Sequence, residues 1–348
     1  MPIKLLLLFC LVIVISPMPA FAERPILIAH RGASGDRPEH TLEAYRLAIE
    51  MGADFIEPDL VLSKDGVLVA RHENEISGTT DVAQRNEFAA RRATKTIDGQ
   101  SVTGWFTEDF TFAELRTLKA RERLPELRVA NIAYDGQFLI PSFDEILALA
   151  QTEGQVRGRV IGVYPETKHP SYFTSIGLPH EAPLLVALAK YGLTKSGSPV
   201  FIQSFEVGNL RALRGKTQVR LIQLIASESG PADLPEMLYT EMITPDGLKA
   251  IAAYADGIGP FKDLVIARTA DGHLGHPTQL VEQAHAVGLE VHPWTFRAEN
   301  YFLPTGLKTS SDPREKGDLA SEIKAFVAAG VDGIFSDHSA EARAALSD

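Results

Sequence analysis

The segments Ile26-Leu-Ile-Ala-His30-Arg31-Gly32 and Phe55-Ile-Glu57-Pro58-Asp59-Leu60 decide the fold of this chain. Each is an apolar run that ends abruptly in charged side chains, which predicts a buried strand with polar groups at its carboxyl end. Glu57 and Asp59 are two residues apart, so on a strand both carboxylates face the same side. A third apolar run, residues 67–70, ends in Arg71 and His72. Structural needs alone do not explain so many charged groups at strand ends.

Apolar runs of this kind recur along the chain and alternate with segments of helical spacing. We count eight candidate strands, at residues 26–30, 55–60, 159–164, 199–203, 219–224, 255–259, 289–292 and 331–335. Candidate helices lie at residues 41–51, 143–151, 182–191, 206–213, 245–254, 278–287 and 320–329. Eight strands alternating with helices favour an α/β fold of the TIM (β/α)8 barrel type over an open doubly wound sheet. No Gly-x-Gly-x-x-Gly pattern follows a strand, which argues against a dinucleotide-binding fold.

One interval interrupts the alternation. Residues 73–141 are rich in charged and turn-forming side chains and are far longer than an ordinary βα loop. Because they follow the second strand, we expect an inserted cap segment over the carboxyl ends of the barrel strands. Residues 300–318 are interpreted as another loop on that face. No Ser- or Gly-rich linker is evident, so residues 23–348 are predicted to form a single domain.

The first 22 residues have the order of a secretory signal peptide. Lys4 precedes an apolar run over residues 5–15, and Ala20-Phe-Ala22 supplies the expected cleavage site. The run is short for a transmembrane helix, and an uncleaved anchor is the alternative. Cys10 is the only cysteine, so the mature protein would lack a thiol nucleophile and a zinc–thiolate site. We expect a periplasmic or secreted protein with no stable membrane insertion after cleavage.

The composition limits the partners. The 348 residues carry a formal net charge of −11, and an acidic chain is repelled by nucleic acid and by anionic membrane surfaces. We therefore expect no nucleic acid partner. An anionic substrate would need local cations or a metal ion to overcome this background. The sequence leaves the oligomeric state open, including a homodimer.

Three carboxylates are expected at one barrel mouth. Glu57 and Asp59 end the second strand, and Glu166 follows the third. Adjacent acids repel one another unless a cation lies among them, and all-oxygen ligation suits a hard divalent ion such as calcium or magnesium. The competing interpretation is a salt-bridge network in which these acids pair with the basic residues of the same segments, Arg31, Arg71 and Lys168.

Two histidines are expected on either side of this site. His30 and His72 end neighbouring strands, and an imidazole pKa of about 6.5 suits both a general base and a general acid. Arg31 and Lys168 are candidate contacts to phosphate oxygens, the arginine through its forked guanidinium. In this arrangement a metal ion would polarise a phosphoryl oxygen while the histidines exchange protons.

Other strand-end residues have less specific patterns. Gln203 ends the fourth strand and is a candidate substrate contact. Phe205 and Trp294 are candidates for the substrate-binding surface, with Trp294 as an apolar wall, although core packing explains either aromatic as well. His40 lies near the start of a helix and is interpreted as a helix cap. His292 is interpreted as a residue of a barrel layer.

Taken together, these motifs resemble the glycerophosphodiester phosphodiesterase family, and in particular its secreted bacterial branch. The resemblance rests on segments in family order, namely His30-Arg31-Gly32, Pro38-Glu39-His40-Thr41, Glu57-Pro58-Asp59, Lys64-Asp65-Gly66 with His72, Pro165-Glu166-Thr167-Lys168, Gln203-Ser204-Phe205, Trp294-Thr295 and Asp332-Gly333-Ile334-Phe335-Ser336-Asp337. It implies a TIM barrel, a divalent cation (Ca²⁺ favoured over Mg²⁺), and hydrolysis of a glycerophosphodiester to an alcohol and sn-glycerol 3-phosphate.

The resemblance also assigns roles by position. It makes His30 and His72 the acid/base pair, and it makes the metal ligands Glu57, Asp59 and Glu166. It suggests that a glycerol hydroxyl attacks first and forms a cyclic phosphate, a route that the sequence does not separate from direct attack by water.

Two residues depart from the family pattern. His40 stands where the family often has Asn, and Glu73 stands where it often has Asp. We expect neither residue to touch a proposed ligand, so the departures would affect fine specificity rather than the reaction.

Two other functions stay open. One is a barrel-type phospholipase that acts on intact lipids, although the acidic composition does not favour a membrane surface. The other is a non-catalytic exported solute-binding protein, a class that usually has two lobes around a hinge. The continuous alternation of strands and helices does not suggest two lobes.

Overall fold

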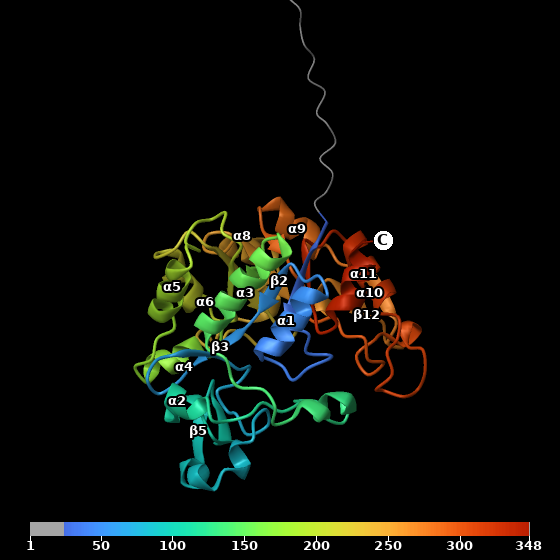
Figure 1. Ribbon diagram of the computed structural model, residues 1–348. Coiled ribbons are helices and arrows are strands. Elements are labelled where there is room, and N and C mark those ends of the chain that lie inside the picture. Colours follow the sequence, from blue (N-terminus) through green and yellow to red (C-terminus); the bar gives the residue numbers. More distant parts are fainter. Residues whose placement is uncertain (1–23, 348) are drawn as a thin grey trace, which may run out of the picture.

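The computed structural model describes residues 24–347, which form a barrel of eight parallel strands surrounded by helices (Figure 1). The predicted TIM barrel is therefore confirmed. The expected signal peptide, residues 1–22, lies outside the described residues. In chain order the barrel strands are β1 (Ile26–His30), β2 (Phe55–Glu57) with β3 (Asp59–Leu62), β7 (Gly162–Val163) with β8 (Glu166–Thr167), β9 (Phe201–Ser204), β10 (Arg220–Ile225), β11 (Gly257–Pro260), β14 (Glu290–Val291) and β15 (Gly333–Ser336).

The barrel wall consists of two hydrogen-bonded sheets, β15-β1-β2-β7 and β14-β11-β10-β9-β8-β3. The second and third barrel strands contribute to both sheets because each is interrupted beside a proline, Pro58 or Pro165. Proline has no N–H group and cannot continue a strand ladder. Asp332 N, just before β15, donates to Val291 O in β14 (3.0 Å). Phe296 N, after β14, donates to Phe335 O in β15 (2.8 Å). These bonds close the ring.

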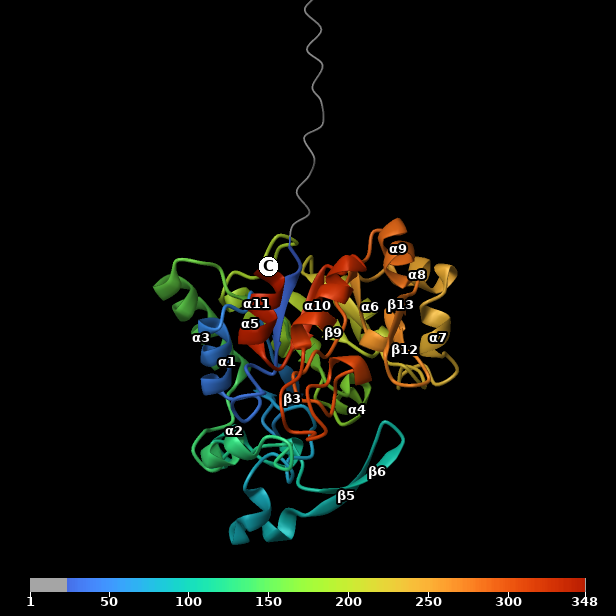
Figure 2. The same ribbon diagram turned by 90° about the vertical axis from the view of Figure 1, so that its right-hand side faces the viewer.

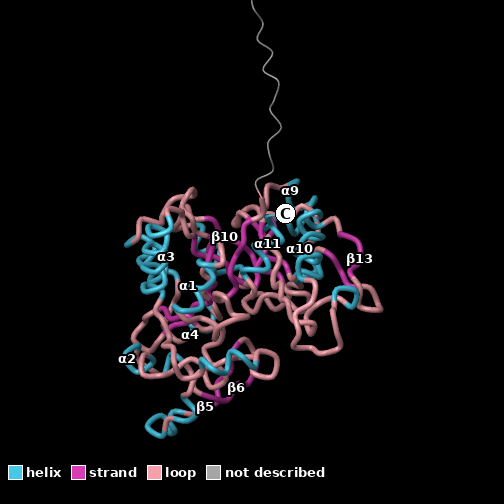
Figure 3. Tube along the Cα trace, turned by 45° about the vertical axis from the view of Figure 1, so that its right-hand side comes forward, coloured by secondary structure: helices cyan, strands magenta, loops and turns pink. Residues whose placement is uncertain are grey.

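Every predicted helix is present, and the ends differ by a few residues. The helices are α1 (Leu42–Glu50), α3 (Phe143–Arg157), α5 (Glu181–Lys190), α6 (Val207–Arg214), α8 (Pro245–Ile251), α9 (Leu280–Ala286) and α10 (Leu319–Ala328). The short helices α4 (Pro170–Ser175) and α7 (Tyr239–Met242) and the terminal helix α11 (Ser339–Ser347) were not predicted. Figure 3 shows the helices outside the strands.

The core has two layers. Inside the barrel, large apolar side chains from different strands pack together: Ile28, Phe55, Tyr164, Phe201, Ile222 and Phe335. A larger apolar layer fills the space between the strands and the helices. Gly162 leaves room for an aromatic ring, because a Cβ there would lie 2.2 Å from the Phe55 ring. His292 is fully buried and bonds through Nδ1 with the Tyr164 hydroxyl (2.8 Å), which fits its interpretation as a barrel-layer residue.

The segment at residues 73–141 lies beyond the carboxyl ends of the barrel strands (Figures 1 and 2). It follows β4 (Leu68–Ala70), which forms an antiparallel hairpin with β3. It contains the hairpin of β5 (Ala93–Ile97) and β6 (Gln100–Gly104), the short helix α2 (Phe112–Leu115) and several 3-10 turns. Buried Arg128 joins this insertion to the barrel through ion pairs with Glu299 (2.7 Å) and Asp337 (2.5 Å).

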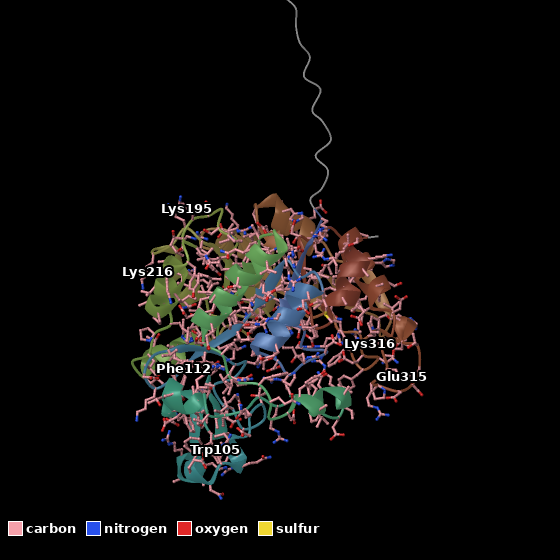
Figure 4. The ribbon with its side chains drawn as sticks, in the orientation of Figure 1. Trp105, Phe112, Lys195, Lys216, Glu315 and Lys316 are labelled. Atoms are coloured by element: carbon pink, nitrogen blue, oxygen red, sulfur yellow. The ribbon has the colours of Figure 1, made fainter. Side chains whose placement is uncertain are left out.

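The two ends of the barrel differ (Figure 4). Trp105 and Phe112 mark the insertion, and Glu315 and Lys316 mark the loop at residues 300–318 near the same end. Lys195, on a loop that leads into a strand, lies toward the opposite end. Among residues 24–347, none of the helices combines the length and the apolar character that a membrane span requires.

Candidate active site

A cavity of about 290 Å³ opens where the carboxyl ends of the strands meet. Nine of the ten predicted site residues line it: His30, Arg31, Glu57, His72, Glu166, Lys168, Gln203, Phe205 and Trp294. Leu224 and Phe335 complete the lining. The tenth predicted residue, Asp59, has an exposed fraction of 1% and lies within the acidic group described next. The fold thus gathers all ten residues in one region.

Glu57, Asp59 and Glu166 form a buried acidic triad, in which one carboxylate oxygen from each residue lies within 4.8 Å of the others. The interruption at Pro58 separates β2 from β3, and Asp59 then pairs in register with Glu166 on β8. Burial, followed by repulsion from Asp59 and Glu166, raises the pKa of Glu57 well above its usual value. Burial likewise raises the pKa of Glu166 to about 8.

Asp59 differs from its two neighbours. Burial disfavours its ionisation, but Lys168, a hydrogen bond with His40 and the nearby Arg31 guanidinium together hold its pKa well below the usual value. The triad therefore has one ionised carboxylate and two that burial and repulsion keep from ionising readily. A divalent cation among the three carboxylates would remove this repulsion, and three oxygen donors suit a hard ion.

Two basic side chains partly offset the triad. Lys168 Nζ lies 2.9 Å from Glu166 Oε1, and Arg31 Nε lies 3.2 Å from Asp59 Oδ2. Glu57 accepts hydrogen bonds from Arg31 N (2.8 Å) and Gln203 Nε2 (3.1 Å), but it has no ion pair within residues 24–347. The salt-bridge interpretation is therefore realised only in part.

Arg71, the third base of that interpretation, lies outside the triad. It is fully buried and donates from Nη1 to the Glu39 carbonyl (3.3 Å). Its backbone N donates to the Asp59 carbonyl (2.9 Å), but within residues 24–347 its guanidinium makes no hydrogen bond or ion pair with the three carboxylates.

His30 is held by the carboxylate of Asp337, a residue to which no role in the site was assigned from the sequence. Its Nδ1 lies 2.6 Å from Asp337 Oδ1, and Asp337 also accepts from Arg128 (2.5 Å) and Arg297 (2.7 Å). Burial, reinforced by Arg31, lowers the pKa of His30 to about 4. The ring is then neutral near pH 7, and an Nδ1–H bond to Asp337 leaves Nε2 as the proton acceptor.

His72 has a similar arrangement. Its Nδ1 lies 2.6 Å from Glu73 Oε1, and Lys168 Nζ lies 3.4 Å from its Nε2. Burial, together with Arg31 and Lys168, lowers the pKa of His72 well below its usual value. Both histidines thus have a carboxylate at Nδ1 and line the cavity.

The interpretation of His40 was wrong, both as a helix cap and as a residue that touches no proposed ligand. His40 does not cap the helix, because Thr41 Oγ1 accepts from Ala44 N at that position. His40 is fully buried and bonds through Nε2 with Asp59 Oδ2 (3.0 Å), and Glu73 contacts the proposed catalytic His72. Both departures from the family pattern therefore touch site residues. The sequence shows no partner for His40, because only the fold brings Asp59 near it, whereas Glu73 directly follows His72 in the chain.

The remaining wall of the cavity is apolar. The rings of Phe205 and Trp294 lie 5.9 Å apart in an edge-on arrangement, and Trp294 Nε1 donates to the Gly259 carbonyl (2.8 Å). This bond fixes the indole against the barrel. The cavity thus combines a charged floor with an aromatic side, which suits a small molecule that has an anionic group and a carbon skeleton.

Comparison with known proteins gives a consistent result. The model of the glycerophosphoryl diester phosphodiesterase family matches residues 30–341. A glycerophosphodiester phosphodiesterase of Arabidopsis thaliana is 38% identical over 332 residues, covering 92% of this chain and 85% of its own. One of Haemophilus influenzae is 30% identical over 298 residues, covering 79% of each chain.

Two solved structures share the fold. A candidate glycerophosphoryl diester phosphodiesterase from Silicibacter pomeroyi has a TM-score of 0.67 and 22% identity, over 93% of this chain and 94% of the other. A phosphodiesterase from Oleispira antarctica, solved in complex with the product sn-glycerol-3-phosphate, has a TM-score of 0.60 and 20% identity, over 93% of this chain and 98% of the other.

Proposed function

Because this chain belongs to the glycerophosphoryl diester phosphodiesterase family, we propose that it hydrolyses a glycerophosphodiester to sn-glycerol 3-phosphate and an alcohol with the help of a divalent cation. One observation carries the proposal: the buried acidic triad and both histidines border a single cavity. The product seen in the Oleispira antarctica complex fits the same reaction. The following paragraphs assign roles to this chain's residues.

Glu57, Asp59 and Glu166 would hold the cation, with Ca²⁺ favoured over Mg²⁺. When bound, such an ion supplies positive charge that polarises the phosphoryl group and offsets the charge that develops on its oxygens. The triad suits it because all three donors are carboxylates and no cation pairs with Glu57 within the described residues. The raised pKa values of Glu57 and Glu166 mean that binding would displace protons.

Arg31 and Lys168 would hold the phosphate oxygens. Both are nearly buried and remain charged, because burial is outweighed by neighbouring acids that raise the pKa of each side chain above its usual value. Gln203 Oε1 is a buried acceptor without a hydrogen-bond partner, and a substrate hydroxyl can donate to it. Phe205 and Trp294 would pack against the carbon skeleton.

His30 and His72 would exchange the protons through Nε2, because a carboxylate lies beside Nδ1 of each ring. One ring in its neutral form accepts the proton of the attacking hydroxyl at Nε2. The other ring acts in its protonated form, which the carboxylate beside its Nδ1 stabilises, and it gives its Nε2 proton to the leaving alcohol oxygen as the phosphorus–oxygen bond to that alcohol breaks. We propose that the attacking hydroxyl belongs to the glycerol and that water then opens the cyclic phosphate. A diester without a neighbouring hydroxyl should then react at least about a hundredfold more slowly.

Product analysis tests the proposed reaction. The purified protein is incubated with a panel of glycerophosphodiesters in chelator, in Ca²⁺ and in Mg²⁺. We expect sn-glycerol 3-phosphate and the free alcohol in the presence of the cation and none in chelator. Failure to hydrolyse any glycerophosphodiester in either cation would refute the proposal. Faster hydrolysis of an intact phospholipid would favour the phospholipase, and binding without turnover would favour the solute-binding protein.

We also propose that the protein is exported to the periplasm or secreted. The support is the basic, apolar and small-residue order of residues 1–22, together with the absence of cysteine after Cys10. Cell fractionation and N-terminal sequencing of the mature protein test this proposal. We expect a mature N-terminus at Glu23, and an uncleaved chain in the cytoplasm would contradict it.

A further inference from the structure

A second cavity lies directly beside the reaction cavity. It has a volume of about 270 Å³ and shares Glu166, Lys168 and Phe205 with the first. Its outer walls include Asp98 of the insertion and Glu206, which follows β9. A diester whose phosphate binds Lys168 in the first cavity can therefore extend one of its two substituents into the second. The mechanism above uses none of the residues on these outer walls.

The charge of the second cavity is not balanced. Its two basic side chains are already paired, Lys168 with Glu166 (2.9 Å), and His169 with Asp98 (2.6 Å) and with Glu73 (3.0 Å). These pairs leave no basic group of the lining for another acid.

Glu206 is the acid without such a partner. Its exposed fraction is 3%, and it accepts hydrogen bonds from Ser171 N (2.9 Å) and Ser171 Oγ (3.0 Å). Within residues 24–347 the structure gives it no ion pair. Burial, with Asp233 nearby, raises the pKa of Glu206 to about 7. A buried carboxylate that lacks a counter-charge is stabilised by a cationic ligand.

Aromatic rings complete the second cavity. Phe205 lies in the wall that the two cavities share, and Tyr239 of α7 lies 6.2 Å from it, ring centroid to ring centroid, at an angle of 69°. The face of an aromatic ring attracts an ammonium group and packs well against its methyl or methylene groups. A carboxylate without a cation and two aromatic rings in one cavity therefore favour an organic cation over a neutral polyol.

We propose that the second cavity holds the alcohol part of the substrate and selects an alcohol that carries an ammonium group, such as choline or ethanolamine. This inference rests on the proposed phosphodiesterase function and adds its substrate class. Glu206 supplies the opposite charge, and Phe205 and Tyr239 supply the aromatic surface. A neutral alcohol such as glycerol or inositol gains neither interaction.

The first test compares substrates. We would measure kcat/KM for glycerophosphocholine and glycerophosphoethanolamine against glycerophosphoglycerol and glycerophosphoinositol, in the wild type and in Glu206→Gln. We expect the preference for cationic over neutral diesters to fall about tenfold in the variant, while the neutral diesters change by less than about threefold. The glutamine amide still offers an oxygen to Ser171, so a purely structural role would not change this preference.

Glu122→Gln is the matched control. Glu122 is also buried, accepts from Leu124 N (2.8 Å) and from Asn131 Nδ2 (2.9 Å), and has no ion pair among the described residues. It lies in the insertion and lines neither cavity. We expect its substrate preference to equal that of the wild type. An equal loss of preference in both variants would refute the role of Glu206.

The second test needs no variant. Choline and its uncharged isostere 3,3-dimethylbutan-1-ol would compete with glycerophosphoglycerol for the wild-type enzyme. We expect choline to inhibit at an about tenfold lower concentration. If choline and 3,3-dimethylbutan-1-ol inhibited equally and cationic and neutral diesters were hydrolysed equally fast, the second-cavity proposal would be refuted. The proposed phosphodiesterase function would not be affected by that result. If no diester were hydrolysed, the proposed function would fail, and calorimetry with the same two ligands would still decide whether the cavity binds cations.

Discussion

At the scale of single residues, each proposed catalytic or metal-binding side chain is held by a second polar or charged side chain. His30 is oriented by Asp337, His72 lies beside Glu73, and Asp59 is bonded to His40. Each of these partners contacts a proposed catalytic or metal-binding side chain, although the sequence assigned none of them a place in the site. Because burial strengthens such electrostatic contacts, the partners are expected to influence the reaction strongly.

The Asp337–His30 pair leads to a first prediction. Replacing Asp337 by Asn keeps an oxygen for the Nδ1–H bond but removes the charge that stabilises a protonated His30. We expect kcat to fall about a hundredfold or more with little change in KM. Steady-state kinetics over a range of pH measure the effect, with the thermal melting temperature as the control for folding. An unchanged kcat would contradict the positioning role.

The raised pKa of Glu166 leads to a second prediction, made for the metal-free protein. The pKa of Glu166 is about 8 in the folded protein, and its ordinary value is 4.5. Between these two pH values the folded state therefore binds more protons at this carboxyl than the unfolded state does. The stability of the wild type should therefore decrease, relative to Glu166→Gln, as the pH rises from about 4.5 to about 8, by on the order of a few kcal/mol. Thermal unfolding in chelator measures both proteins. Parallel pH profiles would contradict the shift.

At the scale of elements, the insertion is attached to the barrel mouth by buried ion pairs. Arg128, which directly precedes a 3-10 turn of the insertion, contacts Glu299 and Asp337, and it also donates to the Ser34 carbonyl (2.9 Å). A single side chain thus connects the insertion, the first βα loop and the carboxylate that orients His30. The insertion is therefore part of the support of the site as well as a covering segment.

Removing this connection gives a third prediction. Arg128→Met should cost about 3–5 kcal/mol of unfolding free energy, because it removes the close cation of buried Glu299 and one of the two guanidinium partners of buried Asp337. Arg121→Met is the matched control: the Arg121 side chain is 41% exposed and pairs with Asp135 at 3.4 Å, so its loss should cost at most about 1 kcal/mol. Urea unfolding measures both variants. Equal losses would show that burial of the Arg128 pairs has no special weight.

At the scale of the whole molecule, barrel closure brings residues from opposite ends of the chain into one cavity. His30 and Phe335 border it from β1 and β15, which pair in register from Ile26–Gly333 to Ala29–Ser336. The acidic net charge of −11 opposes the binding of an anion, so the basic residues and the cation must act locally within this cavity. Closure of the barrel thus brings together the residues that would bind the cation and the substrate.

Cation binding gives a fourth prediction. A ligand that binds only the folded state stabilises it by about 2.7 kcal/mol at a hundredfold excess over its Kd. Adding Ca²⁺ to the chelator-treated wild type should therefore raise its melting temperature by several degrees, and the increase should be lost in Glu57→Gln. Differential scanning calorimetry measures the shift. An equal increase in wild type and variant would place the cation elsewhere.

Much of the fold was predictable from local patterns. The eight strands and seven helices followed from the spacing of apolar residues along the chain. The short helix α4 and the terminal α11 were missed, and α3 extends six residues beyond the predicted end to Arg157. These elements lack strong periodicity, and their packing against neighbours determines them.

The sequence by itself determined which residues stand at the carboxyl ends of the strands, and hence the acids, the histidines and the bases that share the cavity. It did so because strand direction and side-chain alternation are local properties of the chain. Only the tertiary structure decided which groups those residues contact: His40 for Asp59, Asp337 and Arg128 for His30, and Glu206 for the second cavity. Such pairings join residues far apart in the chain, and no local pattern encodes the distance between them.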